Sequence, residues 1–173
     1  ITGNIGIEGG APFSITGQCN AMGSRETSFT TSLPGYRAFD NAEHREELAA
    51  LWKIDATRIP ESRGKAYPDI INDIILDRVR ALWVIGTNPV VSFPNNEFLT
   101  EALSRLDFLV VQDGFHPTPT SEKCDLFLPA AIWGEKEGIY TNSERRASKV
   151  NPATVPPGEA KPDFDIFLDL ARE

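Results

Sequence analysis

The chain has 173 residues, which is enough for one well-packed domain with an additional irregular segment. Its hydrophobic fraction of 40% and charged fraction of 24% are ordinary for a globular protein. The formal net charge of −8 argues against general nucleic-acid binding and against attraction to an anionic membrane surface. It does not exclude an anionic ligand held in a local pocket.

The two cysteines, Cys19 and Cys124, lie far apart and neither belongs to a C-x-x-C pair. We therefore expect no zinc site, no iron–sulfur site and no disulfide framework within this sequence, and we expect a reducing, cytoplasmic compartment. No segment approaches the length of a membrane span, and no signal peptide is visible. Because the chain starts at Ile1 rather than Met and ends in an expected helix, we expect it to be an internal portion of a larger protein.

The first 36 residues are rich in glycine and fit neither a helical nor a strand period. We expect an irregular segment that is functional rather than disordered, because apolar residues are spread through it. These apolar residues are Ile5, Ile7, Phe13, Ile15, Met22 and Phe29. Arg25 is the sole cation before Arg37, and two interpretations stay open: an anion site among backbone amides, or a surface arginine paired with Glu26.

Four helices with an apolar face are expected in the rest of the chain. Residues 40–43 resemble a capping box for a helix that runs to about Trp52, with Leu48, Leu51 and Trp52 as its apolar stripe. A loop over 54–65 leads to a helix from 67 to about 80, which has isoleucines at helical spacing and a proline in its first turn. Further helices are expected after 95–96 and over 163–172, the last with Phe164, Phe167, Leu168 and Ala171 inward.

Residues 81–88 begin with a run of apolar residues that ends at Gly86. The polar residues Thr87 and Asn88 follow. Such runs are typical of strands buried in a parallel sheet, and ligands lie beyond the carboxyl ends of these strands. Glycine permits close approach of the backbone to a ligand, and asparagine offers a donor and an acceptor. A plain strand-to-helix turn would look similar, since the G-x-G-x-x-G spacing is lacking.

A second apolar run, 108–111, ends at Gln112 and Asp113, and one helix lies between the two runs. This is a βαβ pattern, so we expect Asp113 level with Gly86, as a ribose ligand or as a simple turn cap. With a third short run before Pro129, the sequence predicts parallel strands at 81–86, 107–112 and 125–128 in a three-layer α/β domain. His116 could be a ligand, but a lone loop histidine usually is not. Lys136 lies between two glutamates, and such a charge cluster is usually solvated.

Three stretches taken together resemble the molybdopterin oxidoreductases that bind two molybdopterin guanine dinucleotides. They are residues 16–26 (TGQCNAMGSRE), 83–89 (WVIGTNP) and 125–138 (DLFLPAAIWGEKEG). The continuations at 141–146 (TNSERR) and 156–163 (PPGEAKPD) are similar to the nitrate reductase branch, and within it to assimilatory catalytic subunits.

The resemblance implies a Rossmann-like cofactor-binding domain over 66–173, preceded by a segment, 1–65, that is part of the substrate funnel and cofactor cage. The positions that match cofactor-binding residues are Gly86, Thr87, Asn88, Gln112, Asp113, Lys136 and Asp163. Arg25 matches an arginine near the nitrate funnel, where a guanidinium would orient the substrate, and no metal ligand is expected in this chain.

The implied function is nitrate reduction to nitrite by a molybdenum bis(molybdopterin guanine dinucleotide) centre. The resemblance also implies a [4Fe-4S] cluster whose ligands lie elsewhere, an electron-donor protein or subunit, and contacts to remaining domains of the same polypeptide. Two alternatives stay open: a formate dehydrogenase or other oxidoreductase on the same scaffold, and a non-catalytic nucleotide-binding module. The 173 residues alone are expected to be inactive.

Overall fold

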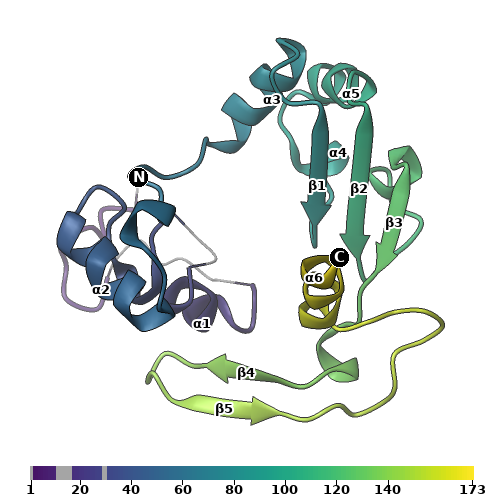
Figure 1. The fold of residues 1–173 in the computed structure, drawn as a ribbon. Coiled ribbons are helices and arrows are strands. Elements are labelled where there is room, and N and C mark those ends of the chain that lie inside the picture. Colours follow the sequence, from purple (N-terminus) through teal and green to yellow (C-terminus); the bar gives the residue numbers. More distant parts are fainter. Residues whose placement is uncertain (1, 11–16, 29–30) are drawn as a thin grey trace. The chain divides into compact units, whose positions relative to one another are not determined.

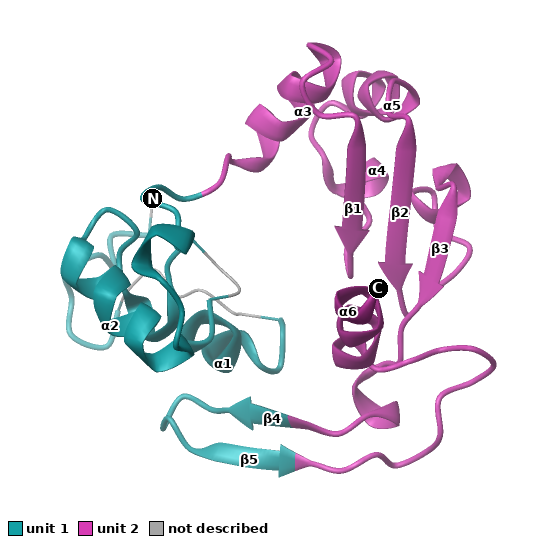
Figure 2. Cartoon of the chain, viewed as in Figure 1, with its two compact units in different colours: residues 1–63, 139–149 teal, residues 64–138, 150–173 magenta. Residues whose placement is uncertain are grey.

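A computed structural model describes residues 2–10, 17–28 and 31–173 (Figure 1). The chain forms two compact units (Figure 2). Unit 1 comprises residues 1–63 and 139–149, and unit 2 comprises residues 64–138 and 150–173. The functional division at residues 65 and 66 stays a prediction, because these units are defined by packing alone.

Unit 2 is built on a three-stranded sheet in the order β1-β2-β3. The strands are β1 (Ala81–Ile85), β2 (Phe108–Asp113) and β3 (Leu126–Pro129), and both pairs are parallel. The predicted parallel α/β domain is therefore confirmed. In the register of the sheet Ile85 lies beside Gln112, so the carboxyl ends of β1 and β2 are neighbours.

Helices α3 (Tyr67–Ile75) and α5 (Asn96–Ser104) pack on one face of this sheet, with the short α4 (Pro89–Ser92) between β1 and α5. Their apolar spacing builds one buried cluster with the strands. Its members are Ile71, Ile74, Val84, Val90, Leu99, Ala102, Leu103, Leu109 and Val111. The side chain of Asn95 caps α5 by accepting from the Phe98 N–H.

Helix α6 (Asp163–Arg172) covers the opposite face. Trp83 packs against Phe167 of α6 with ring centroids 5.3 Å apart, whereas its neighbour Val84 belongs to the cluster under α3 and α5. Successive strand residues point to opposite faces, so the sheet has helices on both sides and three layers. The predicted inward face of α6 is partly wrong: Ile166 is its buried residue, and Phe164 is 70% exposed.

The predicted end of α3 near Arg80 is also wrong, since the helix stops at Ile75. Asp77 has a left-handed φ of 56°, which breaks the helix. The N–H groups of Arg78 and Val79 then turn back to the carbonyl of Asp73. Apolar periodicity continues past this point, and the backbone does not follow it.

Unit 1 contains α1 (Ala21–Glu26) and α2 (Ala42–Trp52), with single 3-10 turns at Pro34–Tyr36 and Ala56–Arg58. A short helix thus lies within the segment that we expected to be irregular. The buried cluster of this unit is small and consists of Leu33, Leu48, Ala49 and Ile59.

Several sequence expectations for unit 1 are wrong. Ile5 is 82% exposed and Ile7 is also exposed, so neither anchors the glycine-rich segment; Phe13, Ile15 and Phe29 lie outside the described residues. Asn41 caps α2 by accepting from the His44 N–H, in place of the box predicted at 40–43. Of the predicted stripe, only Leu48 is buried, because no other described element of the unit covers Leu51 and Trp52.

Two short strands, β4 (Gly138–Thr141) and β5 (Ala147–Val150), pair as a hairpin whose arrows run in opposite directions (Figure 1). The side chain of Asn142 shapes the turn by accepting from the N–H groups of Glu144 and Arg146. Within the described residues, every helix is too short or too polar to cross a membrane.

Candidate functional site

The carboxyl ends of β1 and β2 bring the first two predicted site segments together. Gly86 has a φ of +59°, which favours glycine, and its N–H donates to the carbonyl of Gln112 at 2.8 Å. Asn88 follows two residues later, and Asp113 ends β2. The predicted convergence of Gly86 and Asp113 at one edge of the sheet is therefore confirmed, although no ligand contact is tested by it.

Asp113 takes part in a local turn, as its simpler interpretation suggests. Its Oδ1 accepts from the N–H of Phe115 at 3.0 Å. This bond uses one carboxylate oxygen, and among the described residues Oδ2 has no hydrogen-bond partner. The same side chain can thus cap the turn and still accept from a ligand.

Three more of the predicted residues form one polar cluster. Gln112 is fully buried, and its Nε2 donates to Oδ1 of Asp163 at 2.7 Å. Lys136 forms an ion pair with Oδ2 of the same carboxylate. Lys136 is therefore held by Asp163, from the start of α6, and is not simply solvated between two glutamates. No sequence pattern indicated this pairing.

The buried side-chain oxygen of Gln112, Oε1, has no hydrogen-bond partner among the described residues. Leaving a buried acceptor unsatisfied costs about 1–3 kcal/mol, and native proteins seldom retain such groups without a reason. An orphaned acceptor beside a strand end is what a donor group on a ligand would satisfy.

Sequence reasoning missed Thr120, which is fully buried beside this site. Its Oγ1 donates to Oδ1 of Asn88 at 2.6 Å and accepts from the N–H of Val90 at 3.1 Å. The only signal available was the polar loop after β2. His116, from the same loop, is engaged structurally: its Nδ1 lies 2.9 Å from Oγ of Ser121 and its ring packs on Phe127.

Arg25 lies in unit 1, where it lines a hollow of about 310 Å³ with Cys19, Tyr36 and residues 141–143. The guanidinium of Arg25 has no ion-pair partner within the described part of the chain. Its sequence neighbour Glu26 is paired with Arg145 instead, at 3.1 Å. The interpretation of Arg25 as the partner of Glu26 is therefore wrong. The hollow could hold a small anion.

The backbone around this hollow is fixed by a bond between α1 and the hairpin, since Oδ1 of Asn20 accepts from the N–H of Thr141 at 2.9 Å. Burial, together with a hydrogen bond to Cys19, raises the pKa of the neighbouring Tyr140 above its ordinary value. That tyrosine is therefore neutral at physiological pH and supplies no negative charge to compete with an anion.

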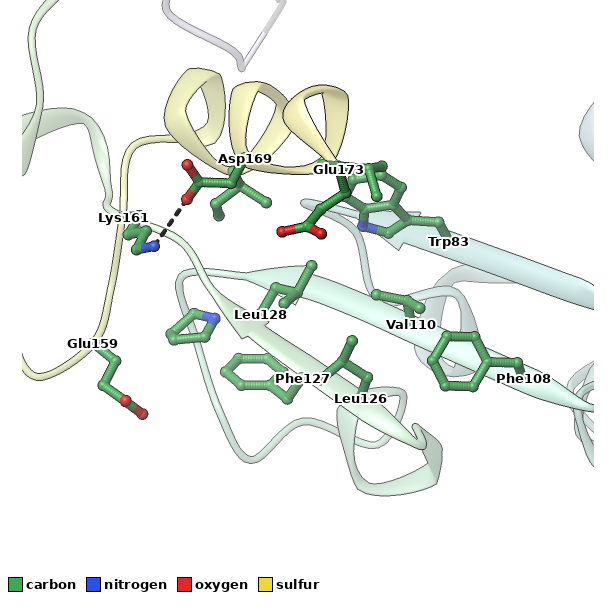
Figure 3. Close-up of a pocket in the computed structure, with 13 residues that line it drawn as sticks. Trp83, Phe108, Val110, Leu126, Phe127, Leu128, Glu159, Lys161, Asp169 and Glu173 are labelled. Atoms are coloured by element: carbon green, nitrogen blue, oxygen red, sulfur yellow. Dashed lines mark hydrogen bonds and ion pairs between the residues drawn. The ribbon is translucent and has the colours of Figure 1, made fainter.

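Unit 2 also carries an open groove of about 560 Å³ beside α6 (Figure 3). Phe108, Val110, Leu126 and Leu128 form its floor, and an ion pair between Lys161 and Asp169 lies at its rim. An apolar floor with acidic side chains at the rim does not suit a phosphate-bearing ligand. The strand ends are therefore the candidate cofactor site, and among the described residues no cluster of metal-ligating side chains is present.

The whole sequence matches one known protein family. The molybdopterin oxidoreductase family model matches residues 1–173, the whole sequence. The chain belongs to the molybdopterin oxidoreductase family. Membership implies a molybdopterin cofactor that contains molybdenum.

Proteins of this family from several organisms are similar to the chain over nearly its whole length. It is 44% identical to a nitrate reductase of Synechocystis, covering 99% of the chain and 24% of that protein. It is 39% identical to an assimilatory nitrate reductase of Haloferax mediterranei and to an F420-dependent formate dehydrogenase alpha subunit of Methanocaldococcus jannaschii, with 23% and 25% of those proteins covered. The chain thus spans about a quarter of the length of these relatives.

The structure is also similar to acetylene hydratase from Pelobacter acetylenicus, with a TM-score of 0.56 and 24% identity. This match covers 64% of the chain and 16% of the hydratase, and it supports the fold alone.

Proposed function

We propose that this chain is the part of a nitrate reductase catalytic subunit that holds one molybdopterin guanine dinucleotide. The observation that carries the proposal is the convergence of Gly86 and Asn88 with Gln112 and Asp113 at adjacent parallel strand ends. Open α/β sheets bind nucleotides at this edge. The proposal for nitrate as substrate is supported by the relatives named nitrate reductase.

The polar groups at the strand ends fit the dinucleotide. Oε1 of Gln112 and Oδ2 of Asp113 are acceptors without partners among the described residues, and a guanine edge and ribose hydroxyls are donors. Gly86 allows a phosphate or sugar to approach the backbone closely. The ion pair of Lys136 with Asp163 fixes the carboxylate that in turn orients Gln112.

When bound, the cofactor would supply the redox chemistry for the conversion of nitrate to nitrite. The residues of this chain bind and orient. Arg25, with its planar fork of donors, would hold the nitrate oxyanion and offset its charge. The guanine dinucleotide form, an iron–sulfur cluster, an electron donor and a cytoplasmic location are further elements of this proposal.

A second candidate is formate oxidation, favoured by the formate dehydrogenase relatives at 38–39% identity. Both activities would use the same strand-end site, because that site holds the cofactor rather than the substrate. The neighbourhood of Arg25 is where the two should differ.

The test uses protein produced from the complete natural reading frame. Purified protein should contain guanine nucleotide and molybdenum in near-stoichiometric amounts and should reduce nitrate with a reduced viologen dye. Formate oxidation without nitrate reduction would establish the second candidate. Protein that binds nucleotide but no molybdenum would support a non-catalytic module and would overturn both.

A further inference from the structure

The side-chain amide of Asn88 is held in one orientation by its surroundings. Oδ1 accepts from the hydroxyl of Thr120 at 2.6 Å, a bond that joins residues 32 positions apart in the sequence. Thr120 is fully buried, so water does not compete for its hydroxyl. The position of Asn88 at a strand end thus depends on a residue from the loop after the neighbouring strand.

The hydrogen-bond inventory of Thr120 selects which face of the amide it holds. A hydroxyl has one proton and two lone pairs, and one lone pair already accepts from the N–H of Val90 at 3.1 Å. If the Asn88 amide were reversed, Nδ2 would donate to the second lone pair and the hydroxyl proton would be left buried without an acceptor. The orientation with Oδ1 toward Thr120 satisfies all three groups.

The orientation of the amide determines which atoms of Asn88 are available to a ligand. Nδ2 is directed away from Thr120, and among the described residues neither of its two N–H donors has a partner. The side chain therefore presents donors, and not its carbonyl oxygen, to a ligand at the strand end. Oxygen acceptors such as a phosphate, a ribose hydroxyl or a carbonyl fit this face.

We propose that Thr120 is a positioning residue that fixes the donor face of Asn88 toward an oxygen acceptor of the bound dinucleotide. This inference rests on the proposed function, which places the dinucleotide at these strand ends. Thr120 itself makes no contact with the ligand. Its effect on binding should pass entirely through Asn88.

The experiment measures the rate at which cofactor is lost from the holoenzyme, followed by release of guanine nucleotide and molybdenum. Thr120→Val keeps the shape but removes the hydroxyl, and it should speed cofactor loss about 3- to 10-fold, as expected for one hydrogen bond. Thr120→Ser retains the hydroxyl and should restore near wild-type retention. Asn88→Ala should speed loss at least as much as Thr120→Val.

The double variant Asn88→Ala, Thr120→Val separates positioning from a structural role. If Thr120 acts through Asn88, the double variant should lose cofactor no faster than Asn88→Ala alone, even though the unpaired Val90 N–H lowers the melting temperature. Thr118→Val is the matched control, because its hydroxyl bonds only within its own loop, to Ser121. It should leave cofactor loss unchanged.

The outcomes distinguish the two proposals. Multiplicative rates in the double variant, or failure of serine to restore retention, would overturn the role of Thr120 and leave the strand-end site intact. Unchanged cofactor loss in Asn88→Ala would instead remove Asn88 from the site and overturn the inference with it.

Discussion

The two units differ in what fixes the position of their functional residues. In unit 2 the backbone positions of Gly86 and Asp113 follow from a parallel register and a buried cluster that joins three helices to two strands. In unit 1 the short α1 and the hairpin are tied together by single bonds, such as Asn20 to Thr141, and the small buried cluster of this unit contains residues of neither element. A sheet and its core support a backbone position through many contacts at once, whereas a position held by a single bond depends on that bond. The predictions below test this contrast in order of expected effect.

The largest effect is expected in the core. Ile74→Ala removes a fully buried side chain from the cluster of unit 2 and should lower the free energy of unfolding by about 2–5 kcal/mol. Leu48→Ala, the matched change in unit 1, falls in the same range. Amide hydrogen exchange on each variant should show the loss confined to the unit that carries it. Loss of protection in both units from either change would contradict the division.

Arg25 should carry the next largest effect, on catalysis. In the complete enzyme, Arg25→Lys keeps the charge but loses the planar fork, and we expect kcat/KM for nitrate to fall about 10²–10³-fold, as when one preorganised donor is removed elsewhere. Steady-state kinetics on protein with verified full cofactor content provides the measurement. Arg145→Lys, in the same unit and already paired with Glu26, is the control and should retain wild-type kcat/KM. Wild-type kinetics in Arg25→Lys would remove it from substrate binding.

The sequence predicted unit 2 well because its signals are periodic and repeated. The apolar runs at 81–85 and 108–111 and the isoleucine spacing of α3 each depend on several residues, so one exception does not change the result. Convergence of Gly86 and Asp113 then followed from the topology. Bonds between distant residues, such as Thr120 to Asn88, have no periodic signal and could not be found.

Unit 1 was predicted less well because few of its features have a periodic sequence signal. The high glycine content concealed α1, which forms over six residues and is stabilised by local bonds such as Ser24 N–H to Asn20. The apparent partner of Arg25 was its sequence neighbour, Glu26, yet that carboxylate pairs with Arg145 from the hairpin. Proximity in sequence is a poor guide to ion pairs on exposed side chains.

Asp113→Ala should weaken cofactor retention without changing the affinity for nitrate. Loss of a charge-assisted hydrogen bond costs about 1.5–3 kcal/mol, so molybdenum and guanine nucleotide per purified protein should fall. Asp107→Ala is the control, because it lies at the opposite end of β2 in an exposed pair with Arg80. Full cofactor content with a raised KM for nitrate would move Asp113 to the substrate.

Asp73 should make the stability of unit 2 depend on acid pH. The hydrogen bond from Lys65, with help from Arg78, holds the pKa of this buried carboxyl below its ordinary value of 3.8. A lowered pKa gives stabilisation that is complete above the ordinary value and is lost as the pH falls through the folded-state value. Unfolding free energies of wild type and Asp73→Asn should therefore converge at acid pH. A constant difference between them down to pH 2 would show that Asp73 contributes no charge-dependent stability.

The smallest effect concerns the ion pair that ties the hairpin to α1 in unit 1. Arg145 and Glu26 are partly solvent-exposed, and such pairs contribute about 0–1 kcal/mol. A double-mutant cycle of Glu26→Gln with Arg145→Gln should therefore give a small favourable coupling energy, which should shrink when the ionic strength is raised to about 1 M. The parallel cycle of Glu26→Gln with Arg25→Gln should give almost none, because Arg25 faces the hollow and not the carboxylate. Since both cycles share one variant of Glu26, any general effect of removing its charge cancels between them. A coupling energy of Glu26 with Arg25 that exceeds the one with Arg145 would mean that Arg25 is the ion-pair partner of Glu26. The proposal that Arg25 binds an anion in the hollow of unit 1 would then fail.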